Sequence, residues 1–363
     1  MNRLIIIGNG FDLAHGLKTK YEDFLLWYLK SKVEILRDDE PAKDRLCTLK
    51  LKNENLRGRR LNILENIDKA KGHKDVIKSI TSSSYNIVYN SLFFKDIINE
   101  DRWVDIENIY YYFLKNSMVI GKRTRINEPF PSIEEINSDL DFLRDKFIEY
   151  LKSECNDFDF DVSESPYLNL FSRKMYYEND NSEVIDGVAD AMLQSKTMIL
   201  NFNYTNLIKK YAEVKTGLFE TVQIHGSLDY PEKIVFGFGD ELDETYQEIE
   251  RLNENKFFEH IKSFRYFQDG NYQKLMAFVD NDPFEVLVLG HSLGLSDRTM
   301  LSQIFENDNL KRVQLYYHQG QKDFTEKTYE ISRHFTSKGR MRELIVPFTR
   351  SEPMPQVEMN SKD

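Results

Sequence analysis

The chain has few cysteines and no long apolar run. Only Cys47 and Cys155 occur among its 363 residues, and neither has a histidine neighbour. Such sparse cysteine excludes a zinc ribbon, argues against a disulfide framework and favours a reducing cytoplasm. No apolar run approaches the roughly 18 residues that span a bilayer, and the first residues lack the apolar core of a signal peptide. We therefore expect a cytoplasmic protein with no membrane partner.

An excess of basic residues is also missing. The chain carries 60 Asp and Glu against 49 Lys and Arg, which gives a net charge of −11 at pH 7. This balance argues against nucleic acid as a partner. Residues 43–60 are a local basic exception. A solvated helix face explains them, and a small site for RNA or a phage component is the alternative. Because no Walker A, HExxH or EF-hand sequence is present, we expect no metal ion.

Apolar runs typical of buried strands recur along the chain. In a parallel sheet that is covered on both faces, strands read as continuous rather than alternating apolar runs. Helical patterns lie between several of these runs, which favours crossover connections. We therefore predict an α/β fold with a Rossmann-like, mostly parallel sheet. The predicted strands are Arg3–Gly8, Lys196–Tyr204, Thr221–Gly226, Lys233–Gly239, Phe284–Gly290 and Arg312–His318, with Glu343–Phe348 as a candidate last strand.

Residues 26–195 differ from the rest of the chain. They are rich in charge, follow the helical period and contain almost no strand-like segment. The simplest organisation is an α/β core formed by residues 1–25 and 196–348. Residues 26–195 are then a large helical insertion after the first strand and helix. Residues 349–363 show no apolar periodicity, so we expect a flexible C-terminal tail.

The opening stretch IIIGNGFDLAHG joins an apolar strand to a helix through Gly8-Asn9-Gly10. Bare backbone amides at the start of a helix suit a phosphate, and glycine lets a ligand approach the main chain. The third glycine of the dinucleotide fingerprint would fall at position 13, which is Leu13, although Gly16 follows closely. The stretch therefore predicts a nucleotide with a pyrophosphate, and a plain tight turn is the alternative.

Two later stretches place polar side chains directly after apolar runs. Asn201 and Asn203 follow one run, and His225 with Gly226 closes another. Carboxyl ends of parallel strands face the crevice where ligands bind. An amide there can hold a ribose hydroxyl or a water, and a neutral imidazole can accept a proton near neutral pH. The alternatives are a helix cap for the asparagines and a structural hydrogen bond for the histidine.

The stretch VLGHSLGLSD contains the G-x-S-x-G pattern of a serine-hydrolase nucleophile elbow around Ser292. The elbow requires a helix that begins at the serine, with an acid and then a histidine further along the chain. Here Gly294 to Asp297 indicate a loop that ends in a helix cap. We therefore favour a loop that closes over a nucleotide, in which Ser292 and Asp297 contact the ribose or the phosphates.

These stretches together resemble known proteins. The runs IIGNGFDLAHGLKTKYEDF, WVDIE, NFNYT, IHGSLD, VFGFGDE and LGHSLGLSD resemble the AbiH family of bacterial abortive-infection proteins. The spacing of Gly8, Gly10 and Gly16 is similar to the phosphate loop of sirtuins, and the later stretches follow in the order of the sirtuin-like NAD-binding fold. This sequence departs from sirtuins in having Asp12 in place of a serine, and it lacks their four-cysteine zinc module.

The resemblance implies a sirtuin-like core that binds NAD, and a role in phage defence. Sirtuin-like defence effectors hydrolyse NAD to nicotinamide and ADP-ribose, whereas the missing zinc module argues against protein deacylation. By this resemblance Gly8 and Gly10 would hold the pyrophosphate. Asn203 would lie near the nicotinamide ribose, and His225 would be the catalytic histidine. The candidate set is Asn203 and His225 for catalysis, and Gly8, Asn9, Gly10, Phe11, Asp12, Gly16, Asn201, Gly226, Gly290, Ser292 and Asp297 for NAD binding.

Two functions are favoured at this point, and a third alternative, hydrolysis of another nucleotide or processing of a nucleic-acid end, would need a metal dependence that the sequence does not indicate. The first is hydrolysis of NAD by an NAD glycohydrolase that acts as an antiphage effector. The second is a nucleotide-binding sensor or interaction protein of a defence system that does not turn over its ligand. For either function, the expected partners are a nucleotide and a phage-derived trigger or a defence partner protein. Assembly into a homo-oligomer stays open.

Overall fold

The structure is a computed structural model that describes residues 1–36, 42–52, 67, 69–100, 103–120, 130–156, 161–173, 196–239 and 244–357. The chain splits into two compact units. Unit 1 consists of Met1–Leu17, Phe158–Val235 and Ser263–Asp363, and unit 2 consists of Lys18–Asp157 and Phe236–Lys262. Unit 2 therefore includes a second stretch, residues 236–262, which the sequence analysis assigned to the α/β core.

Unit 1 is built around a five-stranded sheet of order β6-β5-β1-β7-β8, in which every pairing is parallel. The prediction of an α/β fold with a mostly parallel sheet is confirmed. The strands are β1 (Asn2–Ile7), β5 (Thr197–Asn201), β6 (Glu220–Gln223), β7 (Phe284–Leu289) and β8 (Leu310–Leu315). The helices are α1 (Asn9–Ala14), α8 (Pro166–Ser172), α9 (Leu207–Val214), α11 (Lys262–Arg265, from Ser263 on), α12 (Asn271–Asn281), α13 (Arg298–Phe305), α14 (Gln321–Ser332) and α15 (Lys338–Leu344), with single turns η4 (Pro231–Lys233), η6 (Leu295–Asp297) and η7 (Phe348–Arg350).

The carboxyl ends of the central strands lie level with one another. Ile7 at the end of β1 is paired with Asn201 of β5 on one side and with Leu289 of β7 on the other. The chain passes from β1 outward through β5 and β6 and then returns to β7 beside β1, so the strand order reverses there. In open parallel sheets, ligands bind outside the carboxyl ends at such a reversal. The loops after these strands therefore form the expected ligand-binding edge.

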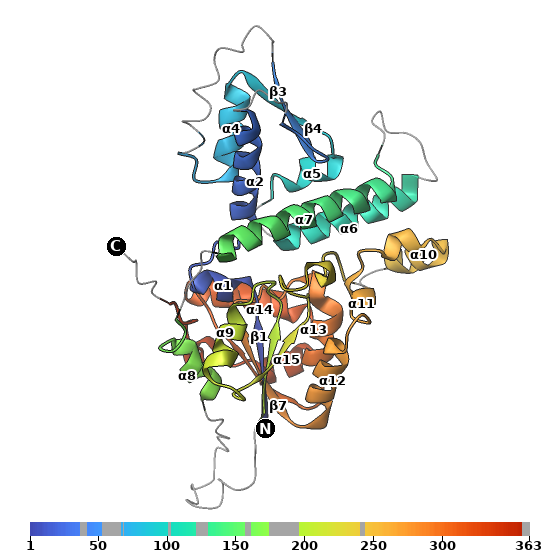
Figure 1. Ribbon diagram of the computed structural model, residues 1–363. Helices are drawn as coiled ribbons and strands as arrows, with labels where there is room; N and C mark the ends of the chain where they lie inside the picture. The colour runs from blue at the N-terminus through green and yellow to red at the C-terminus, as the bar shows by residue number, and fades with distance from the viewer. Residues whose placement is uncertain are drawn as a thin grey trace, which may run out of the picture. The chain divides into compact units, whose positions relative to one another are not determined.

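Alternation along β1 sends its side chains to two faces of the sheet. Leu4 and Ile6 are fully buried in a core that includes Val286 of β7 and Met300 of α13. Ile5, on the opposite face, is equally buried. Figure 1 shows α8 and α9 on one side of β1, with α12 and α13 on the other. Burial on both faces explains why the strands read as continuous apolar runs.

Two predicted strands are wrong. Lys233–Gly239 makes a single bridge, between Phe238 and Ile261. Gly237 has a φ of 150°, and a Cβ there would lie 1.9 Å from His260 O, so this stretch bends where a strand would continue. Glu343–Phe348 begins as the end of α15, and Ile345 then makes one bridge to β8. Its apolar side chains pack against the core of the sheet without extending the sheet.

The expected flexible C-terminal tail is also wrong for the residues that the structure describes. Pro353 forms a bridge with Tyr317, and Val357 N donates a hydrogen bond to Ala14 O over 2.9 Å. Met354 is buried. This segment packs along unit 1 in an extended form, which apolar periodicity does not reveal. Residues 358–363 of the predicted tail lie outside the described part of the chain.

Unit 2 combines helices with a small antiparallel sheet of order β2-β3-β4. The predicted helical insertion therefore also contains strands. They were missed because β3 and β4 are short and place exposed polar residues such as Lys50 and Asn86 among their apolar ones. The elements are α2 (Tyr21–Ile35), β2 (Ala42–Lys43), β3 (Cys47–Leu51), α4 (His73–Ser82), β4 (Tyr85–Tyr89), α5 (Leu92–Ile97), α6 (Trp103–Ile120), α7 (Ile133–Asn156), α10 (Glu244–Leu252) and the turn η5 (Asn255–Phe258).

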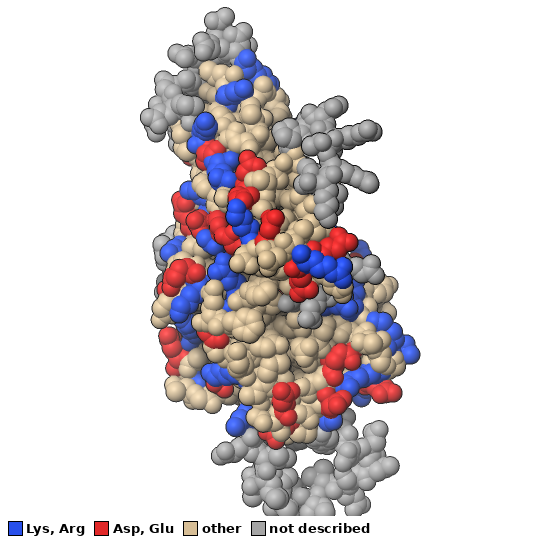
Figure 2. Space-filling model, turned by 90° about the vertical axis from the view of Figure 1, so that its right-hand side faces the viewer, with Lys and Arg blue, Asp and Glu red and all other residues tan. Residues whose placement is uncertain are grey.

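Charged residues occur both inside unit 2 and over the surface. Lys262 Nζ lies 2.7 Å from Glu107 Oε1, and the Lys262 side chain is only 2% exposed, so this ion pair belongs to the interior of unit 2. On the face drawn in Figure 2, acidic and basic side chains are interspersed, without a broad area of one sign. Within the described ranges, no helix is long and apolar enough to cross a bilayer.

Candidate functional site

The loops after β1 and β7 pack against each other through glycine. Gly10 N donates to Gly290 O over 2.9 Å, and Gly8 N donates to Leu289 O over 3.3 Å. A Cβ on Gly10 would lie 2.6 Å from Gly290 Cα, and a Cβ on Gly8 would lie 2.7 Å from His291 Cα. The close approach of two backbones therefore requires glycine at both positions, whether or not a ligand also approaches them.

Asp12 lies within α1 and is 2% exposed. Its two carboxylate oxygens accept hydrogen bonds from Asn203 Nδ2 and Thr205 Oγ1, both over 2.9 Å. Asn203 Nδ2 also donates to Gly8 O over 3.0 Å, and Asn203 N donates to Asn201 Oδ1 over 2.9 Å. The loop after β5 is thus fixed to the first helix by one buried polar network at the carboxyl edge of the sheet.

Burial raises the pKa of Asp12 to about 7, against an ordinary value of 3.8. The hydrogen bonds from Thr205 and Asn203 favour the charged carboxylate and lower the pKa, but the loss of hydration outweighs them. At intermediate pH the folded chain therefore holds a proton on Asp12 that the unfolded chain has already released.

We expect Asp12 to make the protein less stable as the pH rises from about 4 to about 7. The folded state binds more protons than the unfolded state in this range, so the free energy of unfolding falls with pH, by up to about 4 kcal/mol. Asp12→Asn should remove this dependence, because an amide does not titrate in this range. The variant should still fold, because its amide can accept from Asn203 and donate to the Thr205 hydroxyl. Urea unfolding across this pH range measures the effect.

The matched control is Asp308→Asn, because the Asp308 side chain is fully exposed. We expect Asp308→Asn to keep the loss of stability between about pH 4 and about pH 7, because Asp12 is unchanged in this variant. A constant difference in unfolding free energy between Asp12→Asn and the wild type would show that burial does not shift the pKa of Asp12.

A second cluster at the same edge contains His225, Asp297 and His291. His225 Nε2 lies 3.2 Å from Asp297 Oδ1, and His291 Nε2 lies 3.7 Å from Asp297 Oδ2. The three side chains are at most 8% exposed. Leu293 N donates to His291 Nδ1 over 2.9 Å, so neutral His291 carries its proton on Nε2, toward the carboxylate. One buried carboxylate thus lies between two imidazoles.

This cluster is suited to acid–base chemistry. His225 Nε2 makes no hydrogen bond to the described residues, because its contact with Asp297 lacks hydrogen-bond alignment. The ring of Phe202 packs against His225 and His291, with centroids 5.1 Å and 4.0 Å away. An imidazole in such surroundings can accept a proton, and the adjacent carboxylate then stabilises the imidazolium.

The two clusters meet at Gly8. Asn203 donates to the carbonyl oxygen of Gly8, and a Cβ on Gly8 would lie 2.9 Å from His291 Cδ2. Side chains from the loops after β1, β5, β6 and β7 are therefore brought together within unit 1. Of the predicted catalytic residues, Asn203 belongs to the first cluster and His225 to the second.

Three of the predicted binding residues have structural roles. Phe11 is fully buried, and its ring centroid lies 4.9 Å from that of Tyr167. Gly16 has a φ of 84° and lies two residues after the end of α1 at Ala14, where a left-handed residue commonly ends a helix. Gly226 has a φ of 81°, and a Cβ there would lie 2.6 Å from Lys233 O. Backbone conformation and packing alone account for these residues.

The remaining two predicted residues are more accessible. Asn9 is half-buried at the start of α1, and Ser292 is exposed in the loop after β7. The first helical turn after Ser292 begins only at Leu295. This geometry differs from a nucleophile elbow, in which the helix starts at the serine. Ser292 is therefore not placed as a hydrolase nucleophile, and its contact with a ligand stays a prediction.

His15 belongs to a neutral network inside unit 1. Its Nδ1 donates to Phe11 O over 2.7 Å, and its Nε2 accepts from the Tyr211 hydroxyl. The oxygen of Tyr211 can then accept from the Ser165 hydroxyl, 2.6 Å away. Burial lowers the pKa of His15 to about 4, so the imidazole stays neutral near neutral pH. This histidine holds α1 in place.

Sequence reasoning did not include Thr205 and His291 in the candidate set. His291 did carry a signal, because it lies next to Gly290 just after an apolar run. His225 lies next to Gly226 at the end of another such run. Thr205 lies two residues after Asn203, and its hydroxyl donates to Asp12. That partner lies 193 positions away in the sequence, and no local pattern indicates it.

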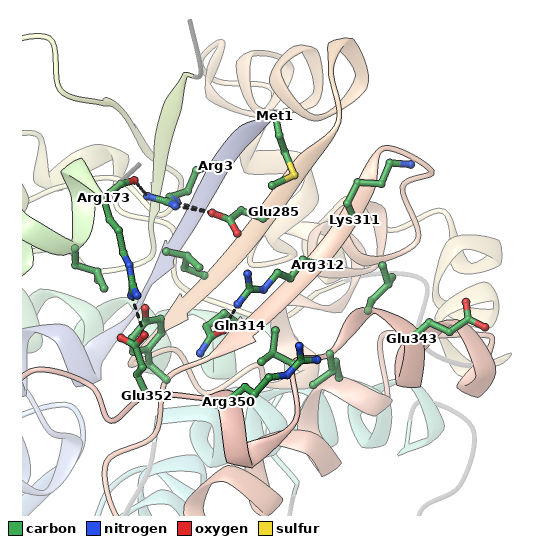
Figure 3. A pocket seen from close by; sticks show the side chains of 16 residues that line it. Met1, Arg3, Arg173, Glu285, Lys311, Arg312, Gln314, Glu343, Arg350 and Glu352 are labelled. Carbon is green, nitrogen blue, oxygen red and sulfur yellow. Dashed lines mark hydrogen bonds and ion pairs between the residues drawn. The ribbon is translucent and has the colours of Figure 1, made fainter. Parts of the chain in front are cut away.

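A cavity of about 540 Å³ lies elsewhere in unit 1. Arg3 and Glu285, on adjacent strands, form a buried ion pair in its wall, with Arg3 Nη2 2.7 Å from Glu285 Oε1. Arg173 and Glu352 form a second pair, 2.8 Å apart (Figure 3). No residue of the predicted site is among those that line the cavity. It is therefore a feature separate from the carboxyl-edge clusters.

Unit 1 is thus a parallel α/β unit in which polar side chains from four loops gather beside the strand reversal. The family model for bacteriophage abortive infection AbiH matches residues 4–319. The chain therefore belongs to the AbiH family, which confirms the resemblance and connects the chain with abortive infection as a defence against phage. No match to the chain was found among the curated proteins.

Proposed function

We propose that the chain is an antiphage effector that binds NAD at the carboxyl edge of the unit 1 sheet and hydrolyses it to nicotinamide and ADP-ribose. The strand order supports a Rossmann-like, sirtuin-like core: numbered along the chain, the five strands are arranged 3-2-1-4-5. The observation that carries the proposal is the buried imidazole of His225, 3.2 Å from Asp297 at this edge.

His225 acts as the general base in this mechanism. A water oxygen forms a bond to C1′ of the nicotinamide ribose while the C1′–N bond breaks. The electron pair of that bond leaves with nicotinamide, which becomes neutral, and the proton of the water passes to His225. Asp297 stabilises the resulting imidazolium because its carboxylate lies beside Nε2. Polar groups at the edge stabilise the positive charge that develops on the ribose.

Asn203 positions the ribose or the attacking water. Its Nδ2 is committed to the carbonyl of Gly8 and the carboxylate of Asp12. These two hydrogen bonds fix the orientation of the amide and leave Oδ1 as the atom that accepts from a ligand hydroxyl or a water. Asp12 thus acts on the ligand only through Asn203.

The direct test is NAD consumption. We expect cells that express the wild-type chain to lose NAD and to accumulate nicotinamide and ADP-ribose after phage infection, measured by chromatography of cell extracts. The His225→Ala variant, expressed at the same level, is the control. If NAD stays constant during infection, and the purified chain releases no nicotinamide with or without an extract of infected cells, the hydrolase proposal must be abandoned.

A nucleotide-binding sensor without turnover is the second candidate. It is favoured by the buried network, in which Asp12 and Gly8 take up the donor group of Asn203. For a sensor, calorimetry would detect NAD binding while no nicotinamide is released. Growth arrest during infection would then survive the loss of the His225 imidazole, which the hydrolase proposal does not allow.

A further inference from the structure

Three side chains with metal-ligating atoms meet within unit 2. Asp141 belongs to α7, whereas Glu259 and His260 follow η5, more than a hundred residues later. One ligand atom from each residue lies within 4.8 Å of the other two. This spacing is small enough for one cation to contact all three. The cluster lies outside the sheet of unit 1 and plays no part in the proposed hydrolysis.

His260 provides an independent indication of a ligand. Its side chain is 2% exposed, and its Nε2 has no hydrogen-bond partner in the described part of the chain. The nearest acidic atom, Asp141 Oδ1, lies 3.6 Å away, beyond hydrogen-bond distance. A buried polar nitrogen without a partner destabilises the fold unless a ligand satisfies it. A metal ion coordinated by Nε2 and the two carboxylates would do so.

The residues around the cluster orient its ligands. Asn137 Nδ2 donates to Glu259 Oε2 over 2.8 Å, and Tyr110 Oη donates to Asn137 Oδ1 over 2.9 Å. The ring of Tyr110 also meets the ring of His260 edge-on, with centroids 5.8 Å apart. Arg144 Nη1 forms an ion pair with Asp141 Oδ1 at a distance of 2.8 Å. Carboxylate and imidazole ligands that are fixed by such outer contacts are typical of metal sites.

We propose that Asp141, Glu259 and His260 bind a divalent transition-metal ion, Zn²⁺ or Mn²⁺. One imidazole nitrogen with two carboxylate oxygens suits these ions, whereas Ca²⁺ and Mg²⁺ prefer all-oxygen sites. Three protein ligands leave further coordination positions for water. Because the ligands come from α7 and from the segment after η5, the bound ion joins two parts of unit 2 that are remote in the sequence.

Calorimetric titration of the untagged, chelator-treated full chain with ZnCl₂ and MnCl₂ tests the site. We expect one ion to bind per chain and the melting temperature to rise with its concentration, because the ion binds the folded state. Asp141→Asn and His260→Gln should each raise the Kd for the ion by about 100-fold. Loss of a residue that merely orients a ligand usually weakens metal binding by about 10–100-fold, and loss of the ligand itself should cost at least as much. Asp141→Asn is nearly isosteric, so it remains informative if His260→Gln fails to fold.

The matched control is Asp145→Asn, because Asp145 lies one turn further along α7, is 67% exposed and also pairs with Arg144. We expect this variant to bind the ion as the wild type does. Equal loss in Asp145→Asn and Asp141→Asn, or no saturable binding by the wild type, would overturn the proposal. These measurements do not involve NAD, so their failure is distinct from a failure of the hydrolase proposal.

Discussion

Replacing His225 by alanine is expected to slow NAD hydrolysis by about 10²–10⁴-fold, the usual contribution of a positioned general base. The imidazole is buried, and its Nε2 lies 3.2 Å from the Asp297 carboxylate, so alanine removes the proton acceptor. NAD binding should persist, because the base acts mainly in the transition state. The rate of nicotinamide release and calorimetric binding of NAD measure the two effects separately.

Two further variants make this result specific. Asp297→Asn keeps the shape of the side chain but removes the charge that stabilises the imidazolium, so the rate should fall while NAD still binds. His318→Ala removes an exposed imidazole outside the cluster and should leave the rate unchanged. If His225→Ala hydrolyses NAD at the wild-type rate, His225 is not the base, and the sensor interpretation gains support.

The sheet of unit 1 could be predicted because its strands carry their own signal. In β1, Leu4 to Ile7 are all buried, so the sequence is apolar at every position and not at every second one. The same holds for β7, in which even Glu285 is buried by its pairing with Arg3. Level carboxyl ends then follow from parallel pairing, which is why polar residues after these strands were expected to meet.

Two segments were wrongly predicted as strands because their apolar residues pack against other side chains and not within the sheet. Phe238 stacks on Tyr111, with ring centroids 4.4 Å apart, and thus belongs to unit 2. Ile345 packs against the core of unit 1 just after a helix ends. An apolar run shows that a segment is buried, but it does not show against what. The boundaries between the two units were missed for the same reason.

The candidate site was predictable in its location but not in its contacts. Asn203 and His225 were singled out because each follows a strand. The partners that determine what they can do, Asp12 and Asp297, depend on how the loops fold back over the sheet. Asp12 was interpreted as a residue near the ligand, whereas its carboxylate is enclosed by Asn203 and Thr205. Such pairings depend on tertiary structure, which local sequence patterns do not encode.

Gly10→Ala is expected to lower the free energy of unfolding by about 3 kcal/mol or more, because overpacking against rigid backbone is among the most destabilising changes. The new Cβ would lie 2.6 Å from Gly290 Cα and 2.9 Å from Gly290 O. Neither atom can move without displacing β7 from β1, since Gly10 N also donates to Gly290 O. Urea unfolding without any nucleotide measures this effect.

Gly339→Ala is the matched control, because it makes the same chemical change in α15, where the new Cβ meets nothing closer than Ser337 Oγ at 3.6 Å. Alanine favours a helix over glycine, so this variant should be more stable than the wild type by about 0.5–1 kcal/mol. The pair separates the two explanations for the opening glycines. If Gly10→Ala unfolds like the wild type but no longer binds NAD, glycine is needed there for the ligand. If it is destabilised without nucleotide, the contact between the two loops already requires it.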